Sequence, residues 1–164
     1  MAKITVNSLG TQPHLYLSTD PTTYTNAVPL VAPLDVTCLT DVTVNSSTGI
    51  YSWVDFCTLD MNKLTTPSDN SISSNMVIDS VKFFGTTGSG PTAPEYGVNG
   101  LSTNKVLVQF VVTMNGEIDL PGTLWYQGTG YVTDISPTVS PDSPVWVSPI
   151  TIAVTGSFTQ GLTP

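Results

Sequence analysis

The sequence contains very little basic charge. Its 164 residues include four lysines, no arginine and one histidine, against ten aspartates and two glutamates, so the formal net charge is −8. Proteins that hold nucleic acid need clustered Lys and Arg to neutralise phosphates. The composition therefore argues against a phosphate-binding surface. It is compatible with an acidic wall that repels DNA and lets it pass, and equally with acidity that only keeps the protein soluble.

Histidine and cysteine are almost as scarce. A Ser-His-Asp or Cys-His catalytic group would have to use His14, which stands near the start of the chain with no obvious partner in the sequence. Cys38, Cys57 and this single histidine do not provide the closely spaced ligands of a zinc site. We therefore predict no catalytic residue, no bound cofactor and no metal, and an enzyme is the least favoured class.

Two other motifs suggest chemistry only superficially. Glu117 and Asp119 are two residues apart and share a face of an extended segment, but the pattern of a calcium loop is missing, so a solvated rim is the better interpretation. The run from Gly85 to Gly90 resembles a phosphate cradle but lacks the Lys-Ser/Thr that follows in one. We expect a loop there.

Long apolar runs are missing as well. No stretch approaches the ~18 residues of a membrane span. The first residues contain no apolar segment of the kind found in signal peptides, so we expect a protein that is not secreted. Without secretion, Cys38 and Cys57 are expected to be free buried thiols rather than a disulfide.

Thr, Ser, Val, Gly and Pro dominate the composition, which is typical of strands and turns. The length suits one domain, residues 1–164. Alternating apolar residues predict an all-β fold, a two-sheet sandwich or barrel of about seven or eight strands. The clearest predicted strands are 36–44, 50–59, 106–114, 124–135 and 145–158, with shorter candidates at 3–9, 14–17 and 77–84.

The remaining segments are less regular. Residues 45–49 are predicted to form a turn. Residues 65–75 are polar and broken by Pro67, and 71–79 could form one short flanking helix. Residues 85–104 are rich in Gly and Pro and predict a long loop, which is unusual in a compact domain unless it is functional or mobile.

The predicted strand 50–59 is apolar on both faces. Ile50 and Val54 lie on one face, and Tyr51 and Trp53 on the other. Such a strand is either covered on both sides or belongs to an interface. The aromatic residues also allow a carbohydrate platform, although packing in the core or in interfaces is the more common use of large rings. The residues considered for this platform are Trp53, Trp125, Tyr126, Tyr131 and Trp146.

Three segments carry a resemblance to a known family. Residues 123–137 contain the sequence Gly-Thr-Gly-Tyr-Val-Thr-Asp-Ile-Ser-Pro, which resembles a "G-x-V-T-x-I-S-P" strand of siphophage major tail tube proteins. Residues 150–160 are similar to the final strand of that family, and 36–60 to its first hairpin. The match covers about half of the chain.

The resemblance implies a β-sandwich subunit with a flanking helix, six copies of which close into a ring, with rings stacking into a tube. It implies a location in the virion tail after synthesis in the host cytoplasm, and tape measure and tail terminator proteins as partners. DNA would pass through the lumen without specific binding, and no membrane is involved. The alternative is a carbohydrate-binding, adhesin or decoration module on a virion.

Two sets of residues are candidates for these roles. Acidic residues on or beside predicted strands are expected to face the lumen: Asp41, Asp55, Asp119 and Asp134. Segments not needed for the core, a possible N-terminal arm (1–9) and the loop 85–104, are expected to join copies, and their candidate residues are Ile4, Val6, Leu9, Pro91, Pro94 and Tyr96.

Overall fold

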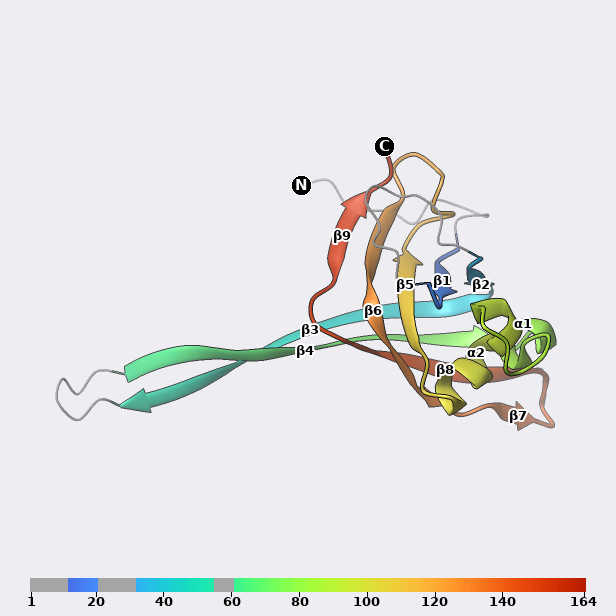
Figure 1. Ribbon diagram of the computed structural model, residues 1–164, viewed down its shortest axis with the longest axis horizontal. Helices are drawn as coiled ribbons and strands as arrows, with labels where there is room; N and C mark the ends of the chain where they lie inside the picture. Colours follow the sequence, from blue (N-terminus) through green and yellow to red (C-terminus); the bar gives the residue numbers. More distant parts are fainter. Residues whose placement is uncertain (1–11, 21–31, 55–60) are drawn as a thin grey trace.

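A computed structural model describes residues 12–20, 32–54 and 61–164. These residues form nine strands and two helices (Figure 1). The strands are β1 (His14–Ser18), β2 (Leu34–Val36), β3 (Leu39–Val54), β4 (Met61–Val77), β5 (Leu107–Thr113), β6 (Leu124–Ile135), β7 (Thr138–Ser140), β8 (Ser143–Val154) and β9 (Thr159–Leu162). The helices are α1 (Ser80–Phe84) and α2 (Ala93–Thr103). The predicted all-β class is confirmed, and two short helices flank the sheet, although neither lies at 71–79, where a helix was expected.

All nine strands belong to one antiparallel sheet. Seven of them follow the order β2-β1-β5-β6-β8-β4-β3, while β7 pairs with β8 and β9 pairs with β6. The two layers expected from the sequence are two halves of this sheet, because β6 pairs with β5 along one side and with both β9 and β8 along the other. In Figure 1 the half with β5 and β9 runs across the half with β3, β4 and β8. Gly130 permits this junction, since a Cβ there would collide with the backbone of Ala153.

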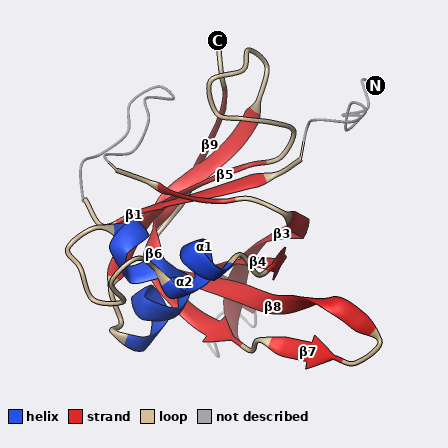
Figure 2. Cartoon of the chain, turned by 90° about the vertical axis from the view of Figure 1, so that its right-hand side faces the viewer, coloured by secondary structure: helices blue, strands red, loops and turns tan. Residues whose placement is uncertain are grey.

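The main hydrophobic core lies where the two halves and the helices meet. It combines Leu17, Val108 and Phe110 from one half with Ile72 and Ile152 from the other, all essentially inaccessible to solvent. The helices complete it by adding Phe83, Val98 and Leu101. Figure 2 shows α1 and α2 (blue) between the upper strands and β8. Burial of these side chains, at about 1.5–3 kcal/mol each, is the main source of stability.

The expected loop 85–104 is wrong in its second half, because Ala93–Thr103 is helical. The backbone N–H and the hydroxyl of Thr92 both donate to Oε2 of Glu95, at 3.0 and 2.6 Å, and Pro94 occupies an early position where its missing N–H costs nothing. Tertiary packing of Val98 and Leu101 overrides the weak helix propensity of the Gly-rich sequence. The expected strand over 77–84 is wrong as well, because β4 ends at Val77 and Ser80–Phe84 forms α1.

The segment 45–79 also differs from expectation. The predicted turn 45–49 lies inside the continuous strand β3, and the predicted helix 71–79 belongs mostly to β4. Residues 45–49 gave a turn-like pattern because both faces of the hairpin meet water there, so the alternation that marks a half-buried strand is missing. In 71–77 every second residue is buried, but one of these inward residues, Ser74, is polar and interrupts the apolar alternation. Pro67 is tolerated because it lies at an irregularity of the ladder between Thr48 and Ile50.

Candidate assembly surfaces

The β3–β4 hairpin extends far beyond the rest of the sheet (Figure 1). Ser71 is the last residue of β4 that pairs with β8, so residues 47–54 and 61–69 form a two-stranded arm. At about 3.3 Å per residue the arm is roughly 30 Å long. Every side chain in it except Asn62 is exposed. A two-stranded ribbon is at best marginally stable in water, and the described residues leave this one uncovered.

The arm is apolar on both faces near its end. Ladder partners share a face, so Tyr51 lies beside Leu64 on one face, and Val54 lies beside Met61 on the other. Tyr51 also stacks on Trp53, with ring centroids 5.9 Å apart. We call the tip the six apolar side chains here that are 41–65% exposed: Ile50, Tyr51, Trp53, Val54, Met61 and Leu64. The expectation that both faces are apolar is confirmed as far as Val54; within the described residues neither face is covered.

A second feature is a polar face on the outer side of β6, β8, β4 and β3. Ladder partners place Asp41, Asn75 and Pro149 in one row across these strands. Thr43, Ser73, Thr151 and Asp134 form the next row. Buried residues such as Ile72 and Ile152 alternate with them and point to the core. The sequence placed both aspartates on strands, and the structure brings them to one surface.

The two aspartates of this polar face differ in their bonding. Asp41 accepts hydrogen bonds from the backbone N–H of Asn75 (3.0 Å) and from its side-chain Nδ2 (2.8 Å), beside a bulge in the β3–β4 ladder. Asp134 is exposed, and its side chain forms no hydrogen bond with the residues that the structure describes. Asp119 is exposed in the turn between β5 and β6, away from the two rows. Asp55 lies outside the described residues.

The residues that were expected to join copies also differ in where the structure places them. Ile4, Val6 and Leu9 lie outside the described residues. The carbonyl of Pro91 accepts a hydrogen bond from Oγ1 of Thr19 (2.8 Å), Pro94 starts α2, and Tyr96 packs against the core. Inside the chain these last three residues support α2 and its approach, so their proposed role between copies has to be tested separately. The sequence signal for the arm was the strand 50–54 with two apolar faces.

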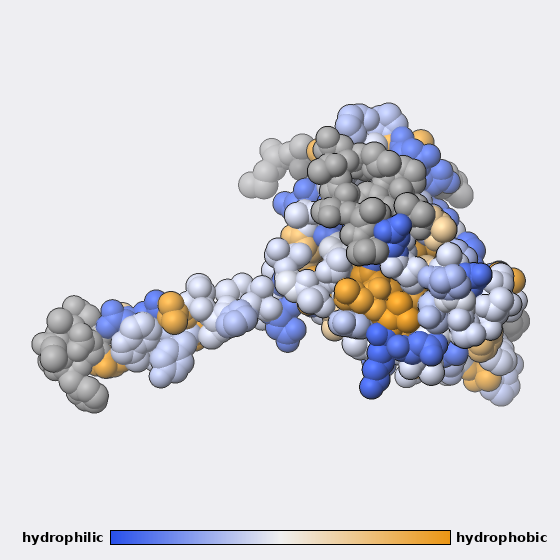
Figure 3. Space-filling view, in the orientation of Figure 1, coloured by the Kyte–Doolittle hydropathy of each residue, from blue (hydrophilic) through white to orange (hydrophobic). Residues whose placement is uncertain are grey.

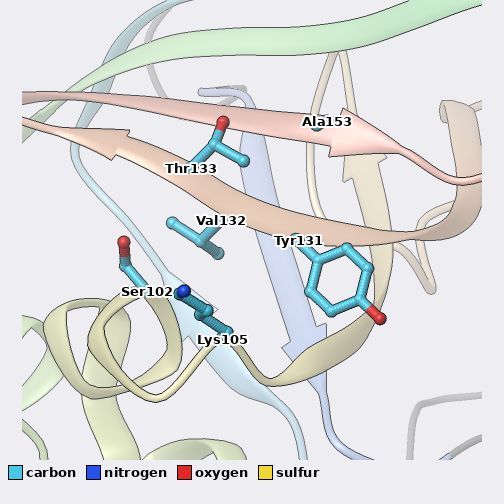
Figure 4. Close-up of a pocket in the computed structure, with 6 residues that line it drawn as sticks. All are labelled: Ser102, Lys105, Tyr131, Val132, Thr133 and Ala153. Atoms are coloured by element: carbon cyan, nitrogen blue, oxygen red, sulfur yellow. The ribbon is translucent and has the colours of Figure 1, made fainter.

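The described surface carries several hollows, and one of them holds about 560 Å³. It lies between the end of α2 and the strands β6 and β8 (Figure 4). Its lining includes Lys105, Ser102, Tyr131, Val132 and Thr133. Among the described residues no group of three or more His, Cys, Asp or Glu side chains is placed to hold a metal ion. The smaller hollows lie at α1 and at the start of β5.

His14 has a partner that the sequence did not reveal. Its Nδ1 lies 3.1 Å from Oδ1 of Asp35, and its ring stacks on Tyr16. Because β1 pairs with β2, this contact links two neighbouring strands. Burial, and then the negative charge of Asp35, raise the pKa of Tyr16 to about 12, so its phenol stays protonated at neutral pH. The arrangement stabilises the strand pair.

The aromatic residues divide between core and surface. Trp125 is buried against Val111, and Tyr126 packs edge-on against Phe158. Trp53, near the end of β3, and Trp146, near the start of β8, are exposed. Cys38 is a free thiol but is exposed rather than buried as expected, and Cys57 lies outside the described residues. No helix in the described part of the chain is long and apolar enough to cross a membrane.

Comparison with known proteins gives matches in structure only. No family model and no curated protein matches the sequence. Among solved structures, a chain from the tail of an empty gene transfer agent particle, solved with C6 symmetry, is similar at a TM-score of 0.57 and 12% identity, over 90% of this chain and 95% of that one. A chain of the anti-feeding prophage baseplate, six-fold symmetrised, is similar at a TM-score of 0.53 and 8% identity, over 96% of this chain and 97% of that one.

A chain of the tube-terminating cap of the anti-feeding prophage is similar at a TM-score of 0.54 and 13% identity, over 99% of this chain and 97% of that one. These likenesses span nearly the whole of each chain. The tail-tube-like fold implied by the resemblance is thereby confirmed as a fold.

Proposed function

We propose that this chain is a structural subunit of a phage-type tail tube, assembling with copies of itself into hexameric rings that stack around a lumen. The observation that carries the proposal is the arm. A roughly 30 Å ribbon with apolar side chains on both faces is stable only when another surface covers it. The shared fold with tail, baseplate and cap chains of particles described with six-fold symmetry supports the ring number.

The polar face supports a passive role for the lumen wall. Its two rows carry Asp41 and Asp134 among uncharged Ser, Thr and Asn side chains, and no lysine. Such a surface repels phosphates and offers DNA no cation to bind. We propose that this face, with further acidic residues such as Asp119, lines the lumen and conducts DNA during ejection. The protein then acts in the virion tail, without catalysis.

The free margins of the sheet give such an assembly its lateral contacts. Among the described residues β3 pairs only with β4, and β2 only with β1, so each leaves one row of backbone groups open. Open strand edges are an aggregation hazard unless they are paired. Neighbouring copies in a ring can pair them and so close the sheets into a continuous wall. Tape measure and tail terminator proteins are the further partners that the same assembly requires.

Shortening the arm tests the proposal. Ser47 and Asp69 are ladder partners, so residues 48–68 can be replaced by Asn-Gly, which forms a two-residue hairpin turn. The full chain is expected to form rings or tubes in negative-stain electron microscopy, whereas the shortened chain stays monomeric and still unfolds in one cooperative thermal transition. Tubes from the shortened chain, or a full chain that never assembles, would contradict the proposal.

One observation favours the alternative of a glycan-binding module. Tyr51 and Trp53 form an exposed stacked pair, and flat exposed rings are what sugars stack on. This alternative predicts a full chain that is monomeric or trimeric and that binds immobilised glycans through Trp53. Glycan binding that a Trp53→Ala variant loses, without any tube under the microscope, would favour it over the tail tube.

A further inference from the structure

Two apolar surfaces lie at opposite ends of the long axis of the molecule. One is the tip of the arm, defined above. The other, which we call the helical end, surrounds a hollow of about 340 Å³ between α1 and the start of β8. Figure 1 places the tip at the left and the helical end at the right, and Figure 3 shows apolar surface at both. The exposed apolar side chains of the helical end are Val81, Phe84, Val145 and Trp146.

We propose that the hollow at the helical end receives the tip of a second copy of this chain. The proposal rests on the self-assembly proposed above and names the surface that completes it. The arm cannot fold back onto its own helical end, because the body of the sheet separates the two (Figure 1). A contact between different surfaces of identical copies is heterologous, and it either closes into a ring or continues without limit. Both outcomes occur in a tube built of stacked rings.

The two surfaces are comparable in area. With about 150–250 Å² for a large side chain, the exposed parts of the tip present on the order of 600 Å², and those of the helical end about 400 Å². Complete burial of both would reach about 1,000 Å², the lower bound for a specific protein interface, before any polar rim is added. The largest exposed apolar patch of a typical monomer is about 300–600 Å² and is often functional. This chain exposes apolar side chains to that extent at each end of its long axis, which is the expected arrangement when each covers the other.

The composition of the hollow explains why it is the receptor. Its walls include Phe84, Trp146, Val145 and Ile78, with Ser80 as a polar contribution. The backbone N–H of Ile78 donates to the carbonyl of Trp146 at 2.8 Å, so the two walls are tied together. The apolar tip therefore enters a preformed apolar site.

The larger hollow differs from this one by a charged group. Both hollows have mostly apolar linings with some polar side chains, but Lys105 lines only the larger one. An apolar tip placed there would remove water from the Lys105 ammonium without replacing its hydrogen bonds, which is unfavourable.

A photo-crosslinker at Tyr51 tests which surface receives the tip. The position is exposed, so a benzoylphenylalanine there is compatible with folding. The full chain is assembled, irradiated and digested, and the cross-linked peptides are identified by mass spectrometry. We expect intermolecular products with residues 78–84 and 145–147. Assemblies whose cross-links fall on 102–107 and 131–133 instead, or on any other segment, would overturn this contact but leave the proposed tube in place.

Matched substitutions give a second readout. Phe84→Asp changes a side chain that is 49% exposed at the helical end, and Tyr131→Asp changes one that is 40% exposed in the larger hollow. Phe84→Asp is expected to reduce the Tyr51 cross-link at least tenfold, while Tyr131→Asp leaves it unchanged. Equal cross-linking in both variants would refute the proposal. A chain that stays monomeric under every condition would overturn the proposed function, and this contact with it.

Discussion

Gly97 inside α2 lies directly against Gly85, the residue at which α1 ends. Both have backbone angles that only glycine adopts readily, φ 75° and ψ 174° at Gly85 and φ 65° and ψ 172° at Gly97. A Cβ on Gly97 would collide with the backbone N of Gly85 and lie 2.7 Å from the carbonyl O of Phe83. The two glycines therefore allow the helices to cross at backbone contact, which positions Phe83 and Val98 in the core.

Gly97→Ala is expected to destabilise the fold by about 3 kcal/mol or more, because it combines a forbidden backbone conformation with a backbone clash. Gly156→Ala is the control: its φ is 82°, but nothing lies within 4 Å of the new Cβ. It should cost about 1 kcal/mol. Urea unfolding at pH 7 measures both. Similar losses in the two variants would show that the contact with α1 contributes nothing.

The strands β5 and β6 were predictable almost to the residue. The apolar alternation of 106–114 and 124–135 corresponds closely to β5 and β6, because burial imposes that pattern. Of the arm, only the strand beginning at residue 50 was predicted, and no strand was predicted over 61–69, since a ribbon that meets water on both faces carries no such alternation. Its long-range pairing, with Ser47 opposite Asp69, is a property of the fold and leaves no local signal.

The helix α2 was also hard to predict, because its stability does not come from local helix propensity. Gly97 and Gly100 lower the helix propensity of 93–103, and tertiary packing supplies the stability instead. One local signal was available: Thr92 and Glu95 stand three residues apart, with proline between them, which is the spacing of a capping box. For the candidate site, the sequence placed Asp41 and Asp134 on strands, but only the ladder register shows that they share the polar face.

The Thr92–Glu95 contact makes a prediction about pH. Hydrogen bonds from the hydroxyl and the backbone N–H of Thr92 lower the pKa of Glu95 below its ordinary value of 4.5. A lowered folded-state pKa contributes stability that is present above the unfolded pKa and is lost as the pH falls through the folded pKa. Glu95→Gln keeps an acceptor but cannot titrate.

Wild type should therefore lose stability relative to Glu95→Gln when the pH falls from 6 to 3, as measured by thermal unfolding of both proteins across this range. A difference between the two that stays constant with pH would exclude the ionised form of Glu95 as the source of the stabilisation.

Asp41 is expected to matter to the fold more than Asp134 does. Asp41→Ala removes two hydrogen bonds to Asn75 at an exposed site and should cost about 1 kcal/mol. Asp134→Ala removes none within the described structure and should be nearly neutral. Urea unfolding distinguishes them, and equal effects would show that the bond to Asn75 is not what Asp41 contributes.

This difference makes Asp134 the better position for testing the lumen, because its charge can be reversed without disturbing the β3–β4 ladder. If the polar face lines the tube, Asp134→Lys together with Thr43→Lys places two cations per subunit at the two ends of one row on its wall, with Ser73 and Thr151 between them. Tubes with these changes should retain short double-stranded DNA on sedimentation at low salt, and release it as salt is raised, because phosphate contacts are salt-dependent. In a virion, the same changes should slow genome delivery.

Ser89→Lys is the control, since it adds a lysine at an exposed position between α1 and α2, away from the polar face. Its tubes should release DNA as wild-type tubes do. The doubly substituted tubes have to keep their normal diameter under the electron microscope for the comparison to hold. Intact tubes in which both lysines of the polar face leave DNA retention and delivery unchanged would mean that another surface of the subunit faces the lumen.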